Sequence, residues 1–289
     1  MGQSPAGVAR RTIARVMRQA RVRAGIKSGT AAHHAGIAPG TLTKYEKAEN
    51  PWPVSVVHLL AEYYGLSTDD RDRIVSLARQ RDPGWWQRHG DSVPAWFEPY
   101  LGLEQEAHTL HNYEDGTVPG LLQTADYARA VLTADIDAGS HDQIAAQVEI
   151  RTRRQDRLTD EEPLTFNAVI NEAALYRVVG GTAVMREQLQ TLLDRAELPN
   201  VDLRILPFEA GAHTGSEGSF VIMQFPGILD DVAAGDVVLV EYRIGALYLE
   251  EESETTSFSQ VFQRLRETAL TPEESRRRIQ HLLQERYAP

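Results

Sequence analysis

Apolar residues recur at helical spacing through the first 81 residues of the chain. A first helix carries its apolar stripe on one face and ends at Gly25; the stripe consists of Ile13, Val16, Met17, Ala20 and Ala24. Two shorter helices are predicted over 28–35 and 39–47, joined by a turn at Gly36 and Ile37. Later stripes predict a fourth helix that Gly65 ends and a fifth that runs to about residue 81.

Beyond residue 103 the pattern mixes helical and strand periods. Helical spacing covers 104–111, 123–132, 141–158, 182–196, 258–270 and 272–287. Apolar alternation or short apolar runs predict strands at 164–170, 201–208, 220–225 and 237–242, with 246–250 a fifth strand or a continuation. Gly211, Gly215 and Gly218 indicate a hairpin-like turn between two of these strands. We therefore expect an all-α five-helix head (1–81), a linking or docking segment (82–103) and a larger α+β domain (104–289).

The segment 82–103 is rich in aromatic residues although proline and glycine interrupt it. Such a segment either docks the head on the following domain or forms part of a ligand or partner surface. Six residues are candidates for that surface, although core packing would explain each almost as well: Trp85, Trp86, Trp96, Tyr100, Tyr113 and Gln123.

Composition places the chain among ordinary globular proteins. Its 289 residues are 42% hydrophobic and 25% charged, enough for two domains with real cores. The absence of cysteine excludes disulfides, thiolate zinc sites and cysteine nucleophiles, and it fits a reducing compartment. The sequence shows neither a signal peptide nor a run of apolar residues long enough for a membrane helix, so a cytoplasmic location is expected.

Charge is unevenly distributed along the chain. Residues 1–50 hold nine Lys or Arg against two Glu, a net charge of +7, whereas the remainder carries −18. Affinity for a polyanion depends on local neutralisation of phosphates rather than on total charge. A basic head followed by an acidic remainder is therefore compatible with nucleic-acid binding. Charge alone is equally explained by arginines that simply face solvent.

The two short helices and their glycine turn form a helix-turn-helix unit, whose second helix enters the major groove of DNA. The stretch "MRQARVRAGIKSGTAAHHAGIAPGTLTKYE" resembles the XRE type of this motif, related to phage repressors. The matching positions are Gly25, Ala32, Gly36, Ile37, Leu42 and Glu46. The resemblance implies that Arg21 pairs with Glu46 and fixes the first helix against the third.

Departures from that family change which residues are expected to contact DNA. Ala38 stands where a capping Ser or Thr is usual, which removes about 1 kcal/mol of helix stabilisation. Gly40 offers no side chain to a base. Base reading then falls mainly to Thr43 and Lys44. The rest of the candidate interface comprises the phosphate contacts Lys27, Ser28, Thr41 and Lys47, with Pro39 and Gly40 at the start of the recognition helix.

A second resemblance covers about residues 10–278. The motifs "PGLLQT" and "LPFEAGAH" are similar to those of the WhiJ-like actinobacterial regulators, in which an XRE head precedes an antitoxin-like domain of unknown function. The resemblance implies a transcription factor, frequently encoded beside a small partner protein, with no established enzymatic activity.

Catalytic and metal-binding patterns are weak. Glu104, His108 and His111 would share one face of a helix and could hold a metal, but no HExxH motif accompanies them and no serine lies in a GxSxG elbow. We expect no metal, no cofactor and no enzymatic activity. The expected function is a transcriptional regulator that binds double-stranded DNA as a homodimer and senses a small molecule or a small partner protein. The alternative is a hydrolase or ligand-modifying enzyme that carries a DNA-binding head.

Overall fold

The computed structural model describes residues 7–79, 85–229, 232–233 and 235–288. The five-helix head is confirmed: its helices are α1 (Val8–Arg23), α2 (Ser28–His34), α3 (Pro39–Glu46), α4 (Val54–Tyr63) and α5 (Thr68–Arg79). Their apolar stripes meet in one core around Met17, Leu42, Leu60 and Ile74, which are fully buried. Residues 80–84, which contain the predicted end of the fifth helix and the start of the linking segment, lie outside the described residues.

The larger domain is α+β, as expected, and is built on a six-stranded mixed sheet. Its strands are β1 (Thr109–Glu114), β2 (Thr165–Asn171), β3 (Val201–Leu206), β4 (Phe220–Gln224), β7 (Val237–Tyr242) and β8 (Gly245–Leu249). Their order is β3-β2-β1-β4-β7-β8, with β1, β2 and β3 parallel and the remaining pairs antiparallel. A separate two-stranded ribbon consists of β5 (Gly227–Leu229) and β6 (Val232–Ala233).

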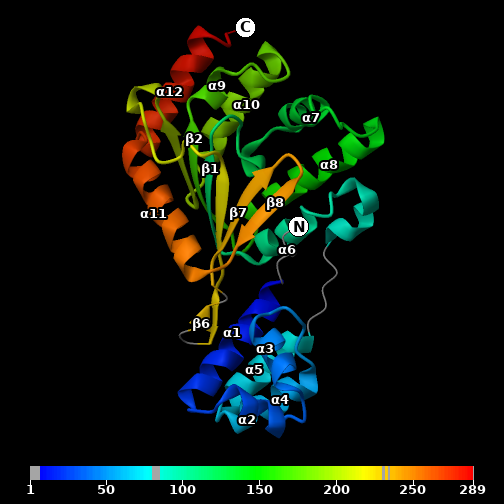
Figure 1. The fold of residues 1–289 in the computed structure, drawn as a ribbon. Helices are drawn as coiled ribbons and strands as arrows, with labels where there is room; N and C mark the ends of the chain where they lie inside the picture. The colour runs from blue at the N-terminus through cyan, green and yellow to red at the C-terminus, as the bar shows by residue number, and fades with distance from the viewer. Residues whose placement is uncertain (1–6, 80–84, 230–231, 234, 289) are drawn as a thin grey trace.

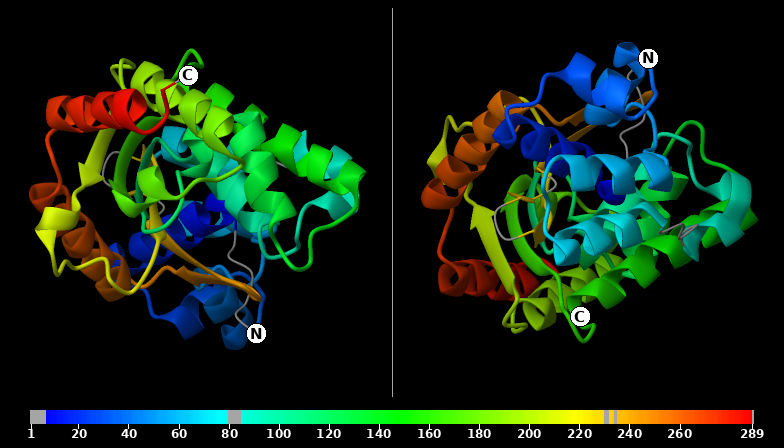
Figure 2. Two further views of the ribbon diagram at one scale, coloured as in Figure 1. Left: turned by 90° about the horizontal axis from the view of Figure 1, so that it is seen from above. Right: turned by 90° about the horizontal axis from the view of Figure 1, so that it is seen from below.

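Helices cover both faces of this sheet (Figures 1 and 2). On one face α11 (Glu252–Thr268) packs Phe262 and Leu265 against Tyr113, Phe220 and Val238. The other face supports the main core, to which five longer helices contribute: α6 (Glu98–Glu106), α7 (Ala125–Thr133), α8 (His141–Arg154), α10 (Thr182–Arg195) and α12 (Pro272–Glu285). Parallel strands require crossover connections, which here run through α7 and α8 and then through α10.

Shorter elements complete the description. They are the four-residue helix α9 (Ala173–Tyr176) and 3₁₀ turns at Trp85–Ser92, Gly120–Leu122, Gln155–Leu158 and Phe208–Ala210.

Two sequence predictions for this domain are wrong. The helix predicted over 104–111 ends at Glu106, and Thr109–Glu114 instead forms β1. β1 pairs with β2 on one side and β4 on the other, and hydrogen bonding of both edges overrides the helical spacing. The glycines 211–218 do not form a hairpin turn, because β3 and β4 are not neighbours: β2 and β1 lie between them in the sheet. The predicted 246–250 segment is a separate strand, β8.

The head contacts the larger domain through α1, which lies beside β6 (Figure 1). Val8 packs into the main core of the larger domain. Arg11 is buried at this junction: its Nη2 donates to the backbone oxygens of Gly235 at 3.0 Å and Asp236 at 3.2 Å, and its Nε lies 3.5 Å from a carboxylate oxygen of Glu250. The two parts of the molecule are therefore joined by a buried cation as well as by the chain.

Candidate functional site

The outer face of α3 is free to contact another molecule. Leu42 turns into the head core, while Pro39, Gly40, Thr43 and Lys44 are exposed. The Thr43 hydroxyl donates to the Pro39 carbonyl oxygen at 3.1 Å and keeps its own oxygen as an acceptor. This is the face that a recognition helix presents to base edges.

The rest of the predicted interface surrounds that face. Lys27 and Lys47 are exposed, and Ser28 and Thr41 are half-buried. Neither α2 nor α3 has a side-chain hydrogen bond at its N-cap, which agrees with the loss of capping expected from Ala38.

All three lysines of the chain lie in this region, as Lys27, Lys44 and Lys47, and every other basic side chain besides the histidines is an arginine. No acidic side chain lies within 4 Å of these lysines among the described residues. Their ammonium groups are therefore available to phosphate oxygens or base edges.

The structure contains the Arg21–Glu46 pair. Nε and Nη2 of Arg21 donate to the two carboxylate oxygens of Glu46 at 2.6 and 2.9 Å, and Nη1 donates to the Ile26 carbonyl oxygen at 2.8 Å. Only 13% of the Arg21 side chain and 8% of the Glu46 side chain are exposed. The bond to Glu46 raises the pKa of Arg21. The pair thus ties α1 to α3.

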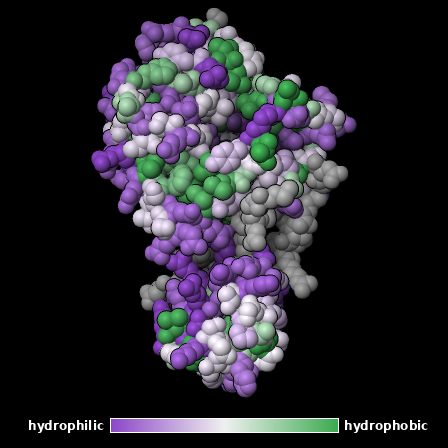
Figure 3. Space-filling model, in the orientation of Figure 1, coloured by the Kyte–Doolittle hydropathy of each residue, from purple (hydrophilic) through white to green (hydrophobic). Residues whose placement is uncertain are grey.

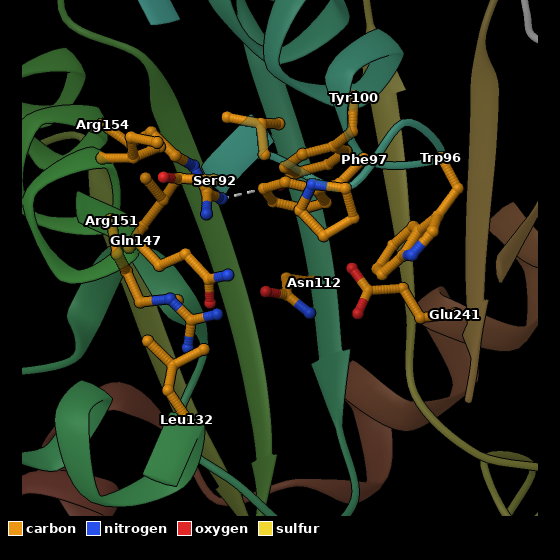
Figure 4. A pocket seen from close by; sticks show the side chains of 15 residues that line it. Ser92, Trp96, Phe97, Tyr100, Asn112, Leu132, Gln147, Arg151, Arg154 and Glu241 are labelled. Carbon is orange, nitrogen blue, oxygen red and sulfur yellow. Dashed lines mark hydrogen bonds between the residues drawn. The ribbon is translucent and has the colours of Figure 1, made fainter. Parts of the chain in front are cut away.

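The larger domain contains a cavity of about 190 Å³ between α8, the segment 92–100 and the sheet. An aromatic wall of Trp96, Phe97 and Tyr100 forms one side; Trp96 meets Phe97 edge-on at 5.5 Å, and Phe97 stacks on Tyr100 at 5.1 Å between ring centroids. The apolar part of the lining also includes Leu121, Leu132 and Ile150. Figure 4 shows the polar side chains that line the same cavity.

A buried ion pair closes the inner end of this cavity. Arg154 donates through Nε and Nη2 to the two carboxylate oxygens of Glu104, both at 2.6 Å, and the Tyr100 hydroxyl donates to the same carboxylate at 2.6 Å. Burial alone would lower the pKa of Arg154, but the Glu104 carboxylate outweighs it and the pKa is raised. The charge of Arg154 is therefore satisfied inside the protein.

Arg151 differs from Arg154 because no carboxylate lies within 4 Å of it among the described residues. Its Nη1 donates to the Gln123 side-chain oxygen at 2.7 Å, and Gln123 is itself held by a 2.7 Å bond to the Val118 carbonyl oxygen. Burial lowers the pKa of the Arg151 guanidinium and the neighbouring Arg154 lowers it further, whereas the more distant carboxyls of Glu241 and Glu114 raise it. Arg151 therefore brings to the cavity a positioned positive charge that no carboxylate contacts directly among the described residues.

Glu241 faces Arg151 from the other side. Strand alternation on β7 places Glu241 on the same sheet face as Val237 and Leu239, and Figure 4 shows its carboxyl in the cavity with Asn112 between it and Arg151. No hydrogen bond or ion pair within 4 Å joins the carboxyl group of Glu241 to a residue that the structure describes. The surrounding protein raises the pKa of Glu241, although the nearby Arg154 and Arg151 oppose that rise.

The predicted ligand-binding residues are only partly brought together. Trp96 and Tyr100 line the cavity. Trp85 lies under the Arg153 guanidinium at 4.3 Å, outside the cavity, and the buried Trp86 packs in the core. Gln123 does not line the cavity, but its side-chain oxygen accepts a hydrogen bond from Arg151.

Tyr113, another predicted ligand-binding residue, does not line this cavity. It packs on the α11 face of the sheet, because residues 112 and 113 belong to a strand and point to opposite faces. Its neighbour Asn112 lines the cavity instead.

Sequence reasoning missed the charged side chains of the cavity. Gln147, Ile150, Arg151 and Arg154 fall at spacings of three and four on α8, so they share one helix face. The sequence did contain one indication of this cavity: two arginines lie within a helix face that is otherwise turned toward the core. Asn112 and Glu241 could not be found in the same way, because β1 was not predicted and β7 is distant in sequence.

The metal pattern considered for Glu104, His108 and His111 does not persist in the fold. Glu104 lies in α6 and pairs with Arg154, whereas His111 lies on β1, and its Nε2 is 3.1 Å from the Gln224 side-chain oxygen. Within the described residues, no three His, Cys, Asp or Glu side chains are grouped closely enough to hold a metal ion. In the same residues, no helix is both long and apolar enough to cross a membrane.

Comparison with known families assigns both parts of the chain. Residues 12–74 match a helix-turn-helix domain, and this match supports DNA binding and transcription regulation. No curated protein matches the chain, and neither does any solved structure. Residues 97–281, more than half of the chain, match the family described as Domain of unknown function (DUF5753). The chain therefore belongs to the DUF5753 family and carries a helix-turn-helix domain ahead of the domain that defines that family.

Proposed function

We propose that this protein is a sequence-specific transcriptional regulator of the XRE type whose DUF5753 domain binds a small molecule and controls DNA binding by the head. The cavity of that domain carries the proposal: it is partly open, aromatic on one side, and contains a guanidinium without a carboxylate partner. A buried charge costs free energy unless it is paired, so a ligand that pairs with it would gain affinity.

Strands β7 and β8 connect the cavity to the residues that contact the head. Glu241 lies on β7, and Asp236 directly precedes that strand. The backbone oxygen of Asp236 accepts from Arg11 of α1, and Glu250, directly after β8, lies 3.5 Å from the same guanidinium. A ligand that shifts the β7–β8 pair would therefore act on the residues that hold the head.

A second role, binding of a small partner protein as in the antitoxin-like WhiJ group, has an observation of its own. The β7–β8 hairpin exposes Tyr242 by 56%, Ile244 by 96% and Leu247 by 41%. Figure 3 shows apolar surface (green) over this part of the domain. Exposed apolar residues at a sheet edge are typical of an interface with another chain, and a second copy in a homodimer that reads paired half-sites would fit them equally.

We further propose that the domain is not catalytic. Among the lining residues that the structure describes there is no histidine or lysine, and Ser92 has no base beside it. The closest titratable pair near the cavity, Glu104 with Arg154, is held by mutual hydrogen bonds and by Tyr100. Such a pair is suited to fixing the wall of a binding site rather than to transferring protons.

The recognition helix provides the test of DNA binding. Double-stranded sequences selected from a random library by the full chain would be titrated with the native protein and with Lys44→Ala at moderate salt. One lost base contact costs about 1–3 kcal/mol, so affinity should fall about tenfold or more. Arg129→Ala, an exposed change in α7 of the larger domain, is the control and should leave affinity unchanged. Equal affinity of the native protein and Lys44→Ala would remove α3 from the interface.

A further inference from the structure

The chemistry of the cavity defines the ligand more narrowly, an inference that rests on the proposed sensing function. Two opposite charges face each other across the cavity, Arg151 from α8 and Glu241 from β7, yet they do not pair with each other (Figure 4). Each would be left partly desolvated when an uncharged ligand displaces water from the cavity. A ligand that carries a negative charge for Arg151 and a positive charge for Glu241 would offset the free-energy cost of desolvating each of them.

The anionic end of the ligand must be weakly charged. Arg154 is already neutralised by Glu104, which leaves Arg151 as the one unneutralised cation among the described lining residues. The carboxylate of Glu241 would repel a second negative charge on the ligand. These features favour a carboxylate over a phosphate monoester, which carries up to two charges.

The walls and the volume define the body of the ligand. Trp96 and Phe97 offer ring faces and edges to an apolar group of the ligand, and Leu132 and Ile150 add aliphatic surface to the same cavity. A cavity of about 190 Å³ is smaller than the roughly 300–1,000 Å³ of pockets for drug-sized ligands. The side-chain amide of Asn112 stands between the charges in Figure 4, and Gln147 also lines the cavity. Nδ2 of Asn112 already donates to Glu114 and to the Phe220 carbonyl oxygen, so its side-chain oxygen and the Gln147 amide supply the neutral hydrogen-bonding groups.

We propose that the cavity binds a small aromatic zwitterion of amino-acid or dipeptide size, whose carboxylate pairs with Arg151 and whose ammonium group pairs with Glu241. The aromatic group of this ligand packs against Trp96 and Phe97. Binding draws α8 and β7 toward the ligand from opposite sides, and β7 leads back to the residues that hold Arg11.

Isothermal titration of the full chain with phenyl-bearing probes tests this assignment. The zwitterions are L-phenylalanine and the dipeptide L-phenylalanylglycine; 3-phenylpropionate and 2-phenylethylamine each retain one charge, and phenyl phosphate carries the stronger anion. A charge-assisted pair is about twice as strong as a neutral hydrogen bond, so at least one zwitterion should bind about tenfold tighter than every other probe.

Two variants assign the charges to their partners. Arg151→Gln should reduce affinity for the zwitterion about tenfold and leave the affinity for 2-phenylethylamine unchanged. Glu241→Gln should also reduce affinity for the zwitterion about tenfold, but should leave the affinity for 3-phenylpropionate unchanged. Arg153→Gln is the matched control, because it makes the same substitution on α8 at a side chain that packs on Trp85 outside the cavity. Glu241 is exposed on its strand, so its variant tests the assignment even if Arg151→Gln fails to fold.

Several results would overturn the assignment. They are no binding by any probe, equal binding of zwitterions and single-charge probes, tighter binding of phenyl phosphate, or variants that do not change the affinity for the zwitterion. The DNA titration with the same preparations separates this failure from failure of the proposed function. Sequence-selective DNA binding without zwitterion binding would refute the ligand class alone, whereas no sequence-selective DNA binding by the native protein would refute the regulator itself.

Discussion

Single residues in this protein hold charges in places where water is scarce. Arg21 and Glu46 join two helices of the head, Arg154 and Glu104 close the cavity, and Arg11 enters the junction between the two parts. In each case a guanidinium makes several hydrogen bonds at once, which an ammonium group could not do with the same geometry. The lysines, by contrast, remain exposed on the helix-turn-helix surface.

The Arg21–Glu46 pair should contribute measurably to the stability of the head. Arg21→Ala leaves a nearly buried carboxylate without its partner and should lower the free energy of unfolding by about 2–3 kcal/mol, between the values for exposed and fully buried pairs. Chemical unfolding monitored by circular dichroism measures this loss. The double variant Arg21→Ala/Glu46→Ala should recover part of the stability. Unchanged stability of Arg21→Ala would show that the pair contributes nothing.

Glu114 should make stability depend on pH. Burial raises the pKa of this carboxyl to about 7, although Asn112 Nδ2 donates to it at 3.2 Å. The folded protein therefore keeps the proton at a pH where the unfolded chain, with a carboxyl pKa of about 4.3, has lost it. The contribution of Glu114 is thus most favourable below the unfolded pKa, and it declines as pH rises from about 4.3 to about 7.

Glu114→Gln should remove this decline. Relative to the native protein, the variant should gain up to about 3 kcal/mol of stability between about pH 5 and about pH 8. Urea unfolding at the two pH values measures the difference, with Glu161→Gln in an exposed turn as the control. Parallel pH profiles for the native protein and Glu114→Gln would contradict the raised pKa.

At the scale of elements, the β7–β8 pair connects the cavity to the head. Glu241 lies on one of its strands, Tyr248 on the other donates to the Trp96 carbonyl oxygen at 2.9 Å, and the base of the pair meets Arg11. The pair forms one edge of the sheet and has no strand beyond β8 in the described part of the chain. An edge element can shift with less disruption than a central strand.

Arg11→Ala should loosen the head from the DUF5753 domain. The substitution removes two bonds to backbone oxygens and the contact with Glu250, so the head should move more freely, and the radius of gyration from small-angle scattering should increase. Arg18→Ala changes an exposed arginine on the same helix and is the control. Indistinguishable scattering from the native protein and Arg11→Ala would show that Arg11 does not hold the two parts together.

Sequence patterns predicted the secondary-structure elements better than they predicted the contacts between those elements. The stripes of α1 to α5 and of α10 gave the helices because each has a regular apolar face that packs on one core. β1 was missed because its identity depends on pairing with two strands that lie far along the chain. The cavity was only half predicted for the same reason: its aromatic wall is local, whereas Asn112, Arg151 and Glu241 come from three separate elements.

The whole molecule separates its two charges. The first fifty positions, which contain the helix-turn-helix, carry a net charge of +7, and the remainder of the chain carries −18. The helical head lies at one end of the molecule, below the larger domain in the view of Figure 1. This arrangement favours approach of the head to DNA and disfavours contact of the other domain with phosphates. Because α2 and α3 lack side-chain caps and Gly40 has no side chain to offer a base, we expect one head to bind DNA modestly and a second copy to add affinity.

Chromatin immunoprecipitation with sequencing tests the central claim most directly, because it asks whether the full chain occupies defined DNA sites through its recognition helix. The native protein should enrich a limited set of promoter regions that share one sequence motif, and Lys44→Ala, expressed at the same level, should lose most of that enrichment. No enrichment of any shared motif would contradict the assignment of this protein as a DNA-binding regulator, and an identical enriched profile for the native protein and Lys44→Ala would contradict DNA reading through α3.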